Sequence, residues 1–306
     1  MPHRSEKLLL LDTASLYFRA FYGVPDKVKA PDGTSVNAAR GLLDMIAKLV
    51  TTYEPTRLVA CWDDDWRPAW RVDLLPTYKA HRVVEAVATG PDVEEVPDPL
   101  EAQLPVIRAA LEVLGIPISG ASDHEADDVI GTLATRADVP VDIVTGDRDL
   151  FQLVDDDRGI RVVYTARGMS NLEIVDDAAV VSKYGVHAAQ YADFAALRGD
   201  PSDGLPGVTG IGEKSAASLL AACATLDGIR AAAADGSAGT PAQRAKILAA
   251  SDYLDVAPTV VRVARDLDLA PFDDRLRPVD HDAAVALADT WNLGSSMTRV
   301  LAALPH

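Results

Sequence analysis

The sequence contains little cysteine, few aromatic residues and no long apolar run. Its 306 residues include two cysteines, Cys61 and Cys223, and 6% aromatic residues. Two cysteines exclude a disulfide framework, so we expect a reducing environment and a core built mainly from aliphatic side chains. The apolar run near the N-terminus, residues 8–11, is far shorter than a signal peptide or a membrane span requires. We therefore expect a cytoplasmic protein with no membrane segment.

Basic residues are also scarce, because 29 lysines and arginines face 46 aspartates and glutamates, which gives a net charge of -17. This balance argues against a nucleic-acid partner unless many of the acids have another task. Nine acids recur in tight groups, and without them the net charge would be -8, so a surface that binds DNA must be a local basic strip. The nine are Asp12, Asp63, Glu125, Asp127, Asp128, Asp147, Asp149, Asp200 and Asp203.

The grouping of these nine acids predicts a metal site. Carboxylates held together repel one another, by about 4 kcal/mol per pair at 4 Å when the effective dielectric constant is near 20. Positive charge must therefore hold them. Oxygen ligands suit Mg²⁺ or Mn²⁺, whereas Zn²⁺ favours the histidines and cysteines that these groups lack. Because two such ions side by side are used for phosphate displacement, the sequence indicates a metal-dependent enzyme of phosphoryl chemistry.

The order of apolar segments predicts an α/β fold with a parallel sheet. Residues 37–50 carry apolar residues at helical spacing and lie between two short buried strands, which is typical of a parallel connection. Ligands of such sheets bind beyond the carboxyl ends of the strands, so Asp12, Asp63 and Asp147 should converge on one edge. The expected strands are residues 7–11, 57–62, 140–145 and 160–164.

Each acidic group also has an ordinary structural interpretation. Residues 122–125 fit a capping box at the start of a helix, and residues 199–204 have the composition of a turn. Against this, Glu125 and Asp128 share a helix face at i, i+3 spacing with Asp127 beside them, which places three carboxylates within reach of one ion. The joint occurrence of the groups favours the metal site.

A Gly-rich stretch at residues 207–212 suits contact with a nucleic-acid backbone. Its spacing matches neither a Walker loop nor a dinucleotide fingerprint. A small-residue hairpin between two helices presents N–H groups to phosphates without reading sequence. Gly210 and Gly212 would supply the close approach, and Lys214 and Ser215 would add to the grip. The alternative is a plain helix–helix turn.

A second candidate contact lies in residues 64–99, a long excursion from the expected sheet. Tyr78, Lys79 and Arg82 form a compact aromatic and basic group there, which suits base stacking and phosphate contact. A solvated basic turn has the same composition. From about residue 178 the pattern is helical, which predicts a smaller helical part at the C-terminus.

The acidic and Gly-rich motifs occur in the order found in the bacterial 5′-nuclease family. They resemble the flap endonucleases and the 5′-to-3′ exonuclease domain of DNA polymerase I over nearly the whole chain. The motifs that carry the resemblance are Leu11-Asp12, Trp62-Asp63, Glu125-Ala126-Asp127-Asp128, and residues 145–150, 199–203 and 205–214.

The resemblance implies a PIN-like, mostly parallel sheet flanked by helices, with a helical arch at about residues 64–99. It implies a nuclease core at residues 1–177 and a C-terminal α-helical DNA-binding domain at 178–306, with a helix-turn-helix hairpin at 199–215. A potassium ion at this hairpin and a basic DNA contact at Arg19 are implied too.

The resemblance also implies a role for each acid. The first metal would be served by Asp12, Asp63, Glu125, Asp127 and Asp128. The second metal would be held, partly through water, by Asp147, Asp149, Asp200 and Asp203. In the arch, Lys79 and Arg82 would be catalytic groups that also contact DNA, and Tyr78 would stack on a base.

We therefore expect a monomeric, structure-specific 5′ nuclease that uses Mg²⁺ or Mn²⁺. Its partner would be branched or flapped DNA with a 5′ end, and its products a 5′-phosphate and a 3′-hydroxyl, in primer removal and DNA repair. One alternative is an RNA-directed nuclease on the same PIN-like core. The other is a non-catalytic DNA-binding module whose acids stabilise the fold with a divalent ion.

Overall fold

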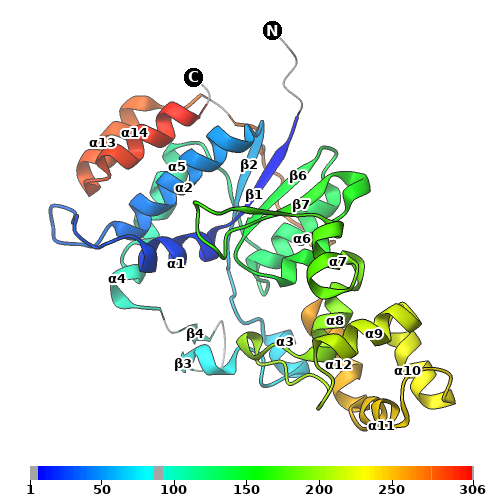
Figure 1. Cartoon of the computed structure of the whole chain (residues 1–306). Helices are drawn as coiled ribbons and strands as arrows, with labels where there is room; N and C mark the ends of the chain where they lie inside the picture. The colour runs from blue at the N-terminus through cyan, green and yellow to red at the C-terminus, as the bar shows by residue number, and fades with distance from the viewer. Residues whose placement is uncertain (1–5, 86–91, 95, 277, 305–306) are drawn as a thin grey trace.

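The computed structural model describes residues 6–85, 92–94, 96–276 and 278–304. At its centre lies a six-stranded sheet with the order β5-β2-β1-β6-β7-β8, in which all neighbours are parallel except β7 and β8 (Figure 1). The predicted mostly parallel sheet is confirmed. The strands are β1 (Leu8–Asp12), β2 (Arg57–Cys61), β5 (Ile118–Ser119), β6 (Val141–Thr145), β7 (Ile160–Tyr164) and β8 (Glu173–Val175).

Alternate residues of the central strands enter two separate cores. In β1, Leu9 and Leu11 pack against one layer of helices, while Leu8 and Leu10 pack against the other. A strand buried on both faces needs a continuous apolar run, which explains why residues 8–11 are all leucine. The first layer contains α1 (Thr13–Gly23), α2 (Asn37–Tyr53) and α5 (Leu104–Val113); the second contains α6 (Ala126–Arg136) and α7 (Asp177–Tyr184).

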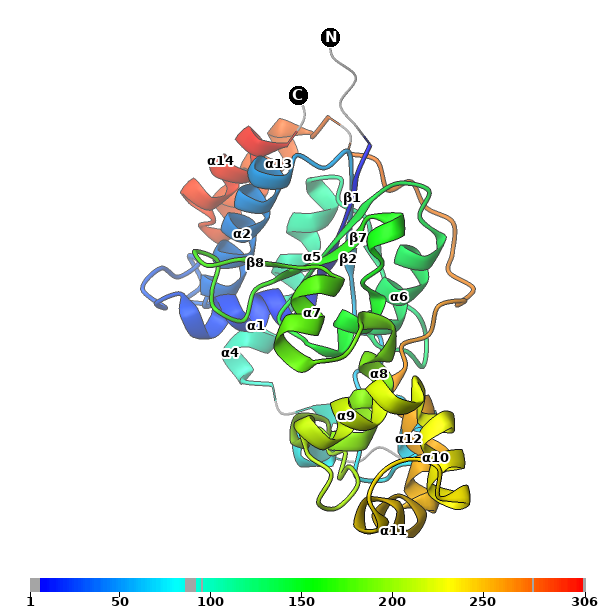
Figure 2. The same cartoon turned by 45° about the vertical axis from the view of Figure 1, so that its right-hand side comes forward.

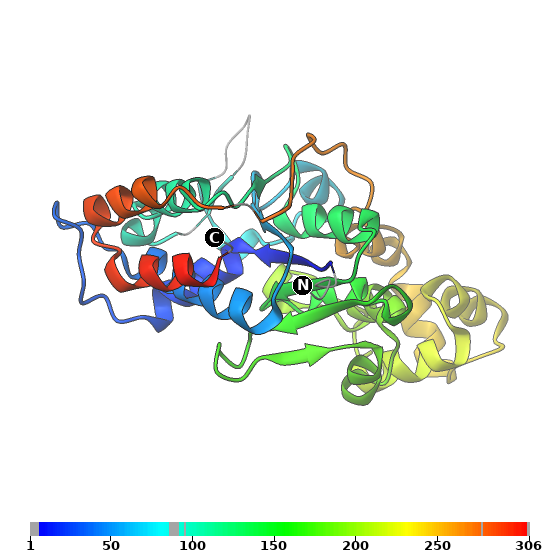
Figure 3. The same ribbon diagram turned by 90° about the horizontal axis from the view of Figure 1, so that it is seen from above.

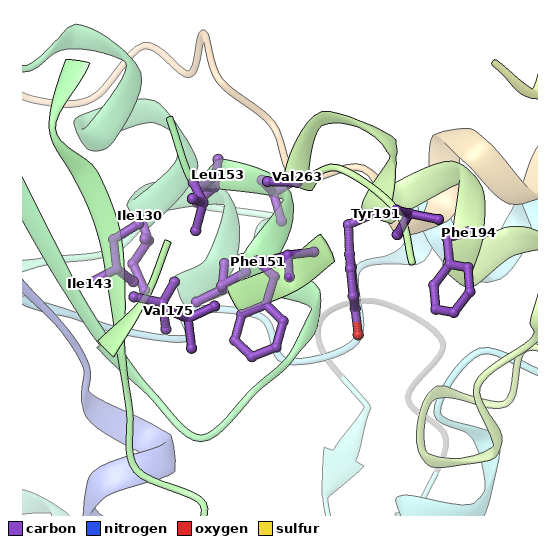
Figure 4. Close-up of a cluster of buried hydrophobic side chains, with 14 of the residues drawn as sticks. Ile130, Ile143, Phe151, Leu153, Val175, Tyr191, Phe194 and Val263 are labelled. Atoms are coloured by element: carbon purple, nitrogen blue, oxygen red, sulfur yellow. The ribbon is translucent and has the colours of Figure 1, made fainter. Parts of the chain in front are cut away.

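A helical domain follows α7 and shares the second core with the sheet. Phe151 of the 3-10 turn η2 (Asp149–Leu153) lies between Ile143 of β6 and Tyr191, with ring centroids of Phe151 and Tyr191 5.5 Å apart (Figure 4). The apolar core therefore runs from the sheet into the helical domain without a break. Its helices are α8 (Tyr191–Arg198), α9 (Glu213–Cys223), α10 (Leu226–Asp235), α11 (Pro241–Ala249) and α12 (Ser251–Val261), with 3-10 turns η4 (Ala188–Gln190) and η5 (Pro201–Asp203). The 3-10 turn η3 (Asp156–Arg158) lies before β7 in the sheet domain.

The helical domain lies below the sheet (Figure 2), and the described parts of the excursion predicted at residues 64–99 lie beside it (Figure 1). Within the excursion, α3 packs against α12. Gly204 of the helical domain, at φ +70, lies so close to this segment that a Cβ atom there would be 1.9 Å from the carbonyl oxygen of Thr77. Residues 86–91 and 95 lie outside the described residues. The elements are α3 (Ala69–Leu74), η1 (Ala80–Arg82), β3 (Val83–Glu85), β4 (Val93–Glu94) and α4 (Asp98–Glu101).

Two features differ from the sequence-based expectations. The helix expected from residue 122 begins at Ala126, where Glu125 is the N-cap residue and Asp128 accepts a hydrogen bond from the Glu125 N–H. The last two helices, α13 (His281–Trp291) and α14 (Gly294–Ala303), leave the helical domain, and α14 packs against α2 at the other end of the molecule (Figure 3). The chain between α12 and α13 runs beside β2, where the backbones of Asp274 and Leu276 form hydrogen bonds with those of Leu58 and Thr56.

No single helix in the described part of the chain is long and apolar enough to cross a membrane. The bent pair of α9 and α10 satisfies the same length and composition test only when both helices are taken together.

The packing of α14 predicts that Met297→Ala destabilises the whole fold. Met297 is 1% exposed and lies in the core shared with α2, so its truncation should lower the free energy of unfolding by about 2–5 kcal/mol. The matched control is Val285→Ala on α13, because Val285 is 50% exposed and its truncation should change stability by less than about 0.5 kcal/mol. Denaturant titration of both variants checks this, and equal losses would contradict the packing argument.

Candidate metal centre

A cavity of about 250 Å³ opens at the carboxyl edge of the sheet. Asp12 is the last residue of β1, while Asp63 and Asp147 follow β2 and β6 by two residues. The register pairs Asp12 with Cys61 and Leu11 with Val144, so the three strands end side by side. The cavity is lined by six acids: Asp12, Asp63, Glu94, Glu125, Asp127 and Asp147.

Local backbone geometry fixes several of these carboxylates. Asp12 caps α1, since its Oδ1 accepts a hydrogen bond from the Ser15 N–H at 3.1 Å, and its Oδ2 accepts one from the Thr145 hydroxyl at 2.6 Å. Asp63 accepts a hydrogen bond from the Ala126 N–H at 2.7 Å, at the start of α6. Helix N-termini favour negative charge, so strand ends and helix starts hold the acids in place.

A second hollow of only about 10 Å³ adjoins the cavity, shares Glu125 and Asp127 with it and is also lined by Arg71. Asp149 and Asp203 line this hollow. The Oδ1 atom of Asp149 is buried, and no hydrogen-bond partner for it is found within the described residues. A buried carboxylate oxygen without a partner is costly, which fits a position where a cation completes its environment.

Burial and mutual repulsion disturb the protonation of these acids. Burial raises the pKa of Asp12 to about 7, although the Thr145 hydroxyl acts in the opposite direction. Burial likewise raises the pKa of Glu125 to about 7, against the attraction of Lys79 and Arg71. For Asp127, burial and then the charge of Asp147 raise the pKa well above its ordinary value. The cavity thus lacks positive charge when no cation is bound.

Two basic side chains from the excursion reach the centre. The Nζ atom of Lys79 lies 3.0 Å from Oε2 of Glu125, and a guanidinium nitrogen of Arg82 lies 3.4 Å from Oδ1 of Asp203. Burial opposes charge on Lys79, but the carboxylate of Glu125 holds its pKa well above the ordinary value. Two bases against the six acids of the cavity leave a large excess of negative charge.

The donor set suits hard divalent cations that keep part of their water. No three acidic, histidine or cysteine side chains of the described residues already surround one point as a complete ligand set. The acids instead line the walls of the cavity, and the donor atoms that they offer are all carboxylate oxygens. Mg²⁺ typically retains several waters and takes one or two carboxylates directly, so this arrangement fits Mg²⁺ or Mn²⁺ held partly through water.

Two of the nine acids are placed differently. Asp200 lies between two arginines, Arg148 at 3.2 Å and Arg198 at 3.1 Å, and its other oxygen accepts a hydrogen bond from the Ser202 N–H. Asp128 is 0% exposed and pairs with Arg71 through two hydrogen bonds. Burial works against charge on Asp128, but the bonds from Arg71 hold its pKa below the ordinary value. Both acids lie outside the two hollows.

The residues predicted to contact DNA divide into covered and exposed groups. The Tyr78 side chain is 4% exposed, and its hydroxyl donates to both carboxylate oxygens of Glu125, so this ring is not free to stack on a base. Its expected stacking role is corrected to packing behind the centre, because α8 and Leu205 cover the ring. Arg19 is half-buried beside Gly146 at the edge of the cavity.

The Gly-rich hairpin lies at the start of α9. Gly210, Gly212 and Lys214 are exposed there, and Ser215 is half-buried. Lys246 of α11 donates a hydrogen bond to the Gly210 carbonyl at 3.0 Å. An ammonium group therefore already occupies one carbonyl of the hairpin, at the position where the resemblance implied a potassium ion.

Sequence reasoning missed three residues of the centre. Thr145 holds Asp12, Glu94 lines the cavity, and Arg71 pairs with Asp128. Thr145 directly precedes the Gly146-Asp147 motif, and its hydroxyl at the end of an expected strand was the signal that could have identified it. Arg71 lies 57 residues before Asp128, so no local spacing connects the two.

A buried carboxylate centre at the carboxyl edge of a parallel sheet, with a helical domain beside it, fits the class of nucleases that use divalent ions. A family model described as the 5′-3′ exonuclease N-terminal resolvase-like domain matches residues 7–185. A second model, the 5′-3′ exonuclease C-terminal SAM fold, matches residues 186–282. The chain belongs to the 5′-3′ exonuclease family, and the resemblance to the 5′ nucleases is confirmed.

Similar proteins span almost the whole chain. The 5′-3′ exonuclease of Streptomyces coelicolor is 60% identical over 97% of this chain and 99% of its own length. The 5′-3′ exonuclease of Mycobacterium tuberculosis is 50% identical, with 97% of each chain covered. DNA polymerase I of Mycobacterium bovis is 39% identical over 92% of this chain and 30% of its own length. The chain is thus a nuclease of this family and resembles one part of DNA polymerase I.

Solved structures show the same fold at lower identity. T5 5′-exonuclease with bound divalent zinc ions has a TM-score of 0.64 at 18% identity, with 97% of this chain and 99% of that chain covered. The catalytic core of Rad2 in complex with DNA substrate has a TM-score of 0.61 at 18% identity, with coverages of 98% and 93%. The PIN-like fold with its helical C-terminal domain is therefore confirmed.

The raised pKa values predict that stability without divalent ions falls as the pH rises from about 4 to about 7. The pKa of Asp12 rises from 3.8 in the unfolded chain to about 7 in the fold, and that of Glu125 from 4.5 to about 7. Their stabilising contribution is fully present below the unfolded pKa and is lost through the folded pKa. Thermal melts across this range, with and without millimolar Mg²⁺, measure the effect.

Mg²⁺ should raise the melting temperature more at about pH 8 than at about pH 5, because it binds the ionised carboxylates. Asp12→Asn provides the matched control, since asparagine also caps helices but carries no charge. In buffer without divalent ions this variant should be more stable than the native protein at about pH 8. A native melting temperature that rises between about pH 5 and about pH 7 would contradict this account.

Proposed function

We propose that this protein is a structure-specific 5′ nuclease, acting as flap endonuclease and 5′-to-3′ exonuclease on DNA. It hydrolyses phosphodiesters with two divalent ions, Mg²⁺ or Mn²⁺, to give a 5′-phosphate and a 3′-hydroxyl. The observation that carries the proposal is the pair of adjoining acidic hollows that share Glu125 and Asp127. Neighbouring ion sites with shared carboxylates are the arrangement for in-line displacement at phosphorus.

The acids divide between the two ions according to the hollow that they line. Asp12, Asp63 and Asp147 would hold one ion in the larger cavity, and Asp149 and Asp203 would hold the other, with the shared acids between them. Bound ions of this kind lower the pKa of an attacking water and stabilise the leaving 3′ oxygen. Asp128 and Asp200 are not proposed as direct ligands, because Arg71 binds both oxygens of Asp128, while two arginines bind Oδ2 of Asp200 and Ser202 binds its Oδ1.

The chain's own cations complete the centre. Lys79 and Arg82 lie on the excursion at the cavity mouth, where they would offset charge developing on the phosphate. Thr145 holds Asp12 in one orientation through the 2.6 Å hydrogen bond. Lys79 pairs with Glu125 in this structure, so it must release that carboxylate when an ion and a phosphate enter.

The substrate class is proposed from three supports. The relatives are named 5′-3′ exonuclease or DNA polymerase I, the Rad2 neighbour is described with a DNA substrate, and the exposed hairpin at Gly210, Gly212 and Lys214 suits backbone phosphates. They support the proposal of branched DNA with a 5′ end as substrate, in primer removal and repair. The monomeric state, the cytoplasmic location and the potassium ion stay predictions.

Asp147→Asn should abolish cleavage of a DNA substrate with a single-stranded 5′ flap. The change removes the Asp147 carboxylate, a proposed metal ligand just beyond β6, so kcat should fall about a hundredfold or more in Mg²⁺. Asp157→Asn is the matched control, because Asp157 is an exposed acid on η3 and its loss should leave cleavage unchanged. The assay follows a flap labelled at its 5′ end, with EDTA as the blank.

The same assay identifies the products and tests the substrate class. A ligase should join the cut strand to the adjoining upstream strand without prior kinase treatment if the cut leaves a 5′-phosphate on the duplex. Faster cleavage of an RNA flap than of a DNA flap would favour the RNA-directed nuclease. No cleavage of either flap in Mg²⁺ or Mn²⁺ would refute the proposed function.

Lys79→Gln should lower kcat while improving the affinity for the metal. The variant loses the positive charge that would stabilise the reacting phosphate, so kcat should fall about a hundredfold. It also loses the ammonium 3.0 Å from Glu125, which competes with a cation, so half-maximal activity should need less Mg²⁺. Lys183→Gln, at an exposed lysine of α7, is the control. A higher Mg²⁺ requirement in Lys79→Gln would show that Lys79 does not oppose the ion.

A further inference from the structure

Asp128 has no oxygen lone pair left for an ion. Its Oδ1 accepts hydrogen bonds from Arg71 at 2.7 Å and from the Ala264 N–H at 2.7 Å. Its Oδ2 accepts hydrogen bonds from Arg71 at 2.8 Å and from the Glu125 N–H at 3.2 Å. A carboxylate has about four acceptor sites, so these four bonds saturate it. To bind a metal ion, Asp128 would have to give up part of its two-pronged hydrogen bond with Arg71.

Arg71 connects three parts of the chain that are far apart in sequence. It belongs to α3 of the excursion, is 2% exposed, and pairs with Asp128 of α6 in the sheet domain. Its Nε also donates to the Val260 carbonyl at 3.0 Å, at the end of α12 in the helical domain. The Trp70 ring covers its guanidinium at 4.4 Å from the ring centroid. This one side chain thus joins the excursion, the sheet and the helical domain.

Arg71 lines the smaller hollow of the metal centre, and its partner Asp128 lies outside both hollows. Arg71 approaches Oε2 of Glu125 at 3.7 Å, and the backbone of Glu125 is bound to Asp128. The same excursion carries Tyr78 and Lys79, which also bind the carboxylate of Glu125. A shift of α3 would therefore move Glu125 and Lys79 relative to each other.

We propose that Asp128 and Arg71 are positioning residues that fix the base of the excursion and the helical domain to the metal centre. Through this contact they set the orientation of Glu125 and Lys79, and they bind neither metal nor substrate. The inference rests on the proposed function, because it concerns the geometry of that same centre. It separates Asp128 from Asp127, the adjacent acid that lines both hollows.

Counting bound ions separates a positioning residue from a ligand. Mn²⁺ titration of the full chain, followed by the electron paramagnetic resonance signal of free Mn²⁺, gives the number of ions bound per molecule. Asp128→Asn should bind as many ions as the native protein, with affinity reduced by about tenfold to a hundredfold. Asp127→Asn should lose an ion. Loss of an ion in Asp128→Asn would overturn the inference.

The kinetic test uses an ion pair elsewhere that also has a buried aspartate. Asp142→Asn breaks it, since Asp142 of β6 is 2% exposed and binds the half-exposed Arg161 of β7 at 2.6 Å and Lys7 at 3.3 Å. Both variants should melt at lower temperature than the native protein. At a temperature where both are folded, only Asp128→Asn should lose kcat on the 5′ flap, by about tenfold to a hundredfold, with KM changed little. Equal kcat values would reduce the pair to a structural role and overturn the proposal.

Arg71→Lys keeps the inference testable if Asp128→Asn fails to fold. Lysine retains the positive charge beside Glu125 but cannot form the two-pronged bond to Asp128. It should bind the native number of Mn²⁺ ions and show kcat below the native value. Native kcat in Arg71→Lys would overturn the inference. A native protein that binds no Mn²⁺ would overturn the proposed function as well, so the two failures are distinguishable.

Discussion

Mutual repulsion among buried carboxylates is the constraint on which the rest of the structure depends. Six acids line one cavity at the carboxyl edge of the sheet, and burial raises the pKa of several of them. Such a group is unfavourable for folding and persists only because the surrounding apolar cores stabilise it. The continuous core from β6 through Phe151 to α8 supplies that support directly beside the acids. Stability elsewhere thus maintains a centre prepared for cations.

Basic residues of the excursion offset part of the negative charge of this centre. Its lysine and arginines approach the acids from outside the sheet, with Lys79 at Glu125, Arg82 at Asp203 and Arg71 at Asp128. Each contact offsets charge, but only the last saturates its carboxylate. Cations or phosphates could therefore replace the contacts of Lys79 and Arg82, whereas the contact of Arg71 leaves no room for such an exchange. The excursion thus provides both exchangeable and fixed positive charges.

Sequence patterns predicted what depends on local spacing and on strand topology. The strands ending at Asp12, Cys61 and Thr145, and the convergence of their acids, followed from apolar runs and the rule for parallel sheets. The return of α14 to α2 did not, because apolar residues at helical spacing do not specify which surface buries them. The partner of Asp128 was unpredictable for the same reason, since only folding brings Arg71 across 57 residues.

Asp127 and Asp128 show how neighbouring residues of one type acquire different roles. On a helix, successive side chains point about 100° apart, so one acid faces the cavity while the next faces the domain junction. There Asp128 meets an arginine and two backbone N–H groups, and Asp127 meets other acids. The carboxylate of Asp127 therefore faces other acids, whereas the carboxylate of Asp128 accepts four hydrogen bonds. What faces a residue, more than its type or its motif, therefore decides which partners its carboxylate has.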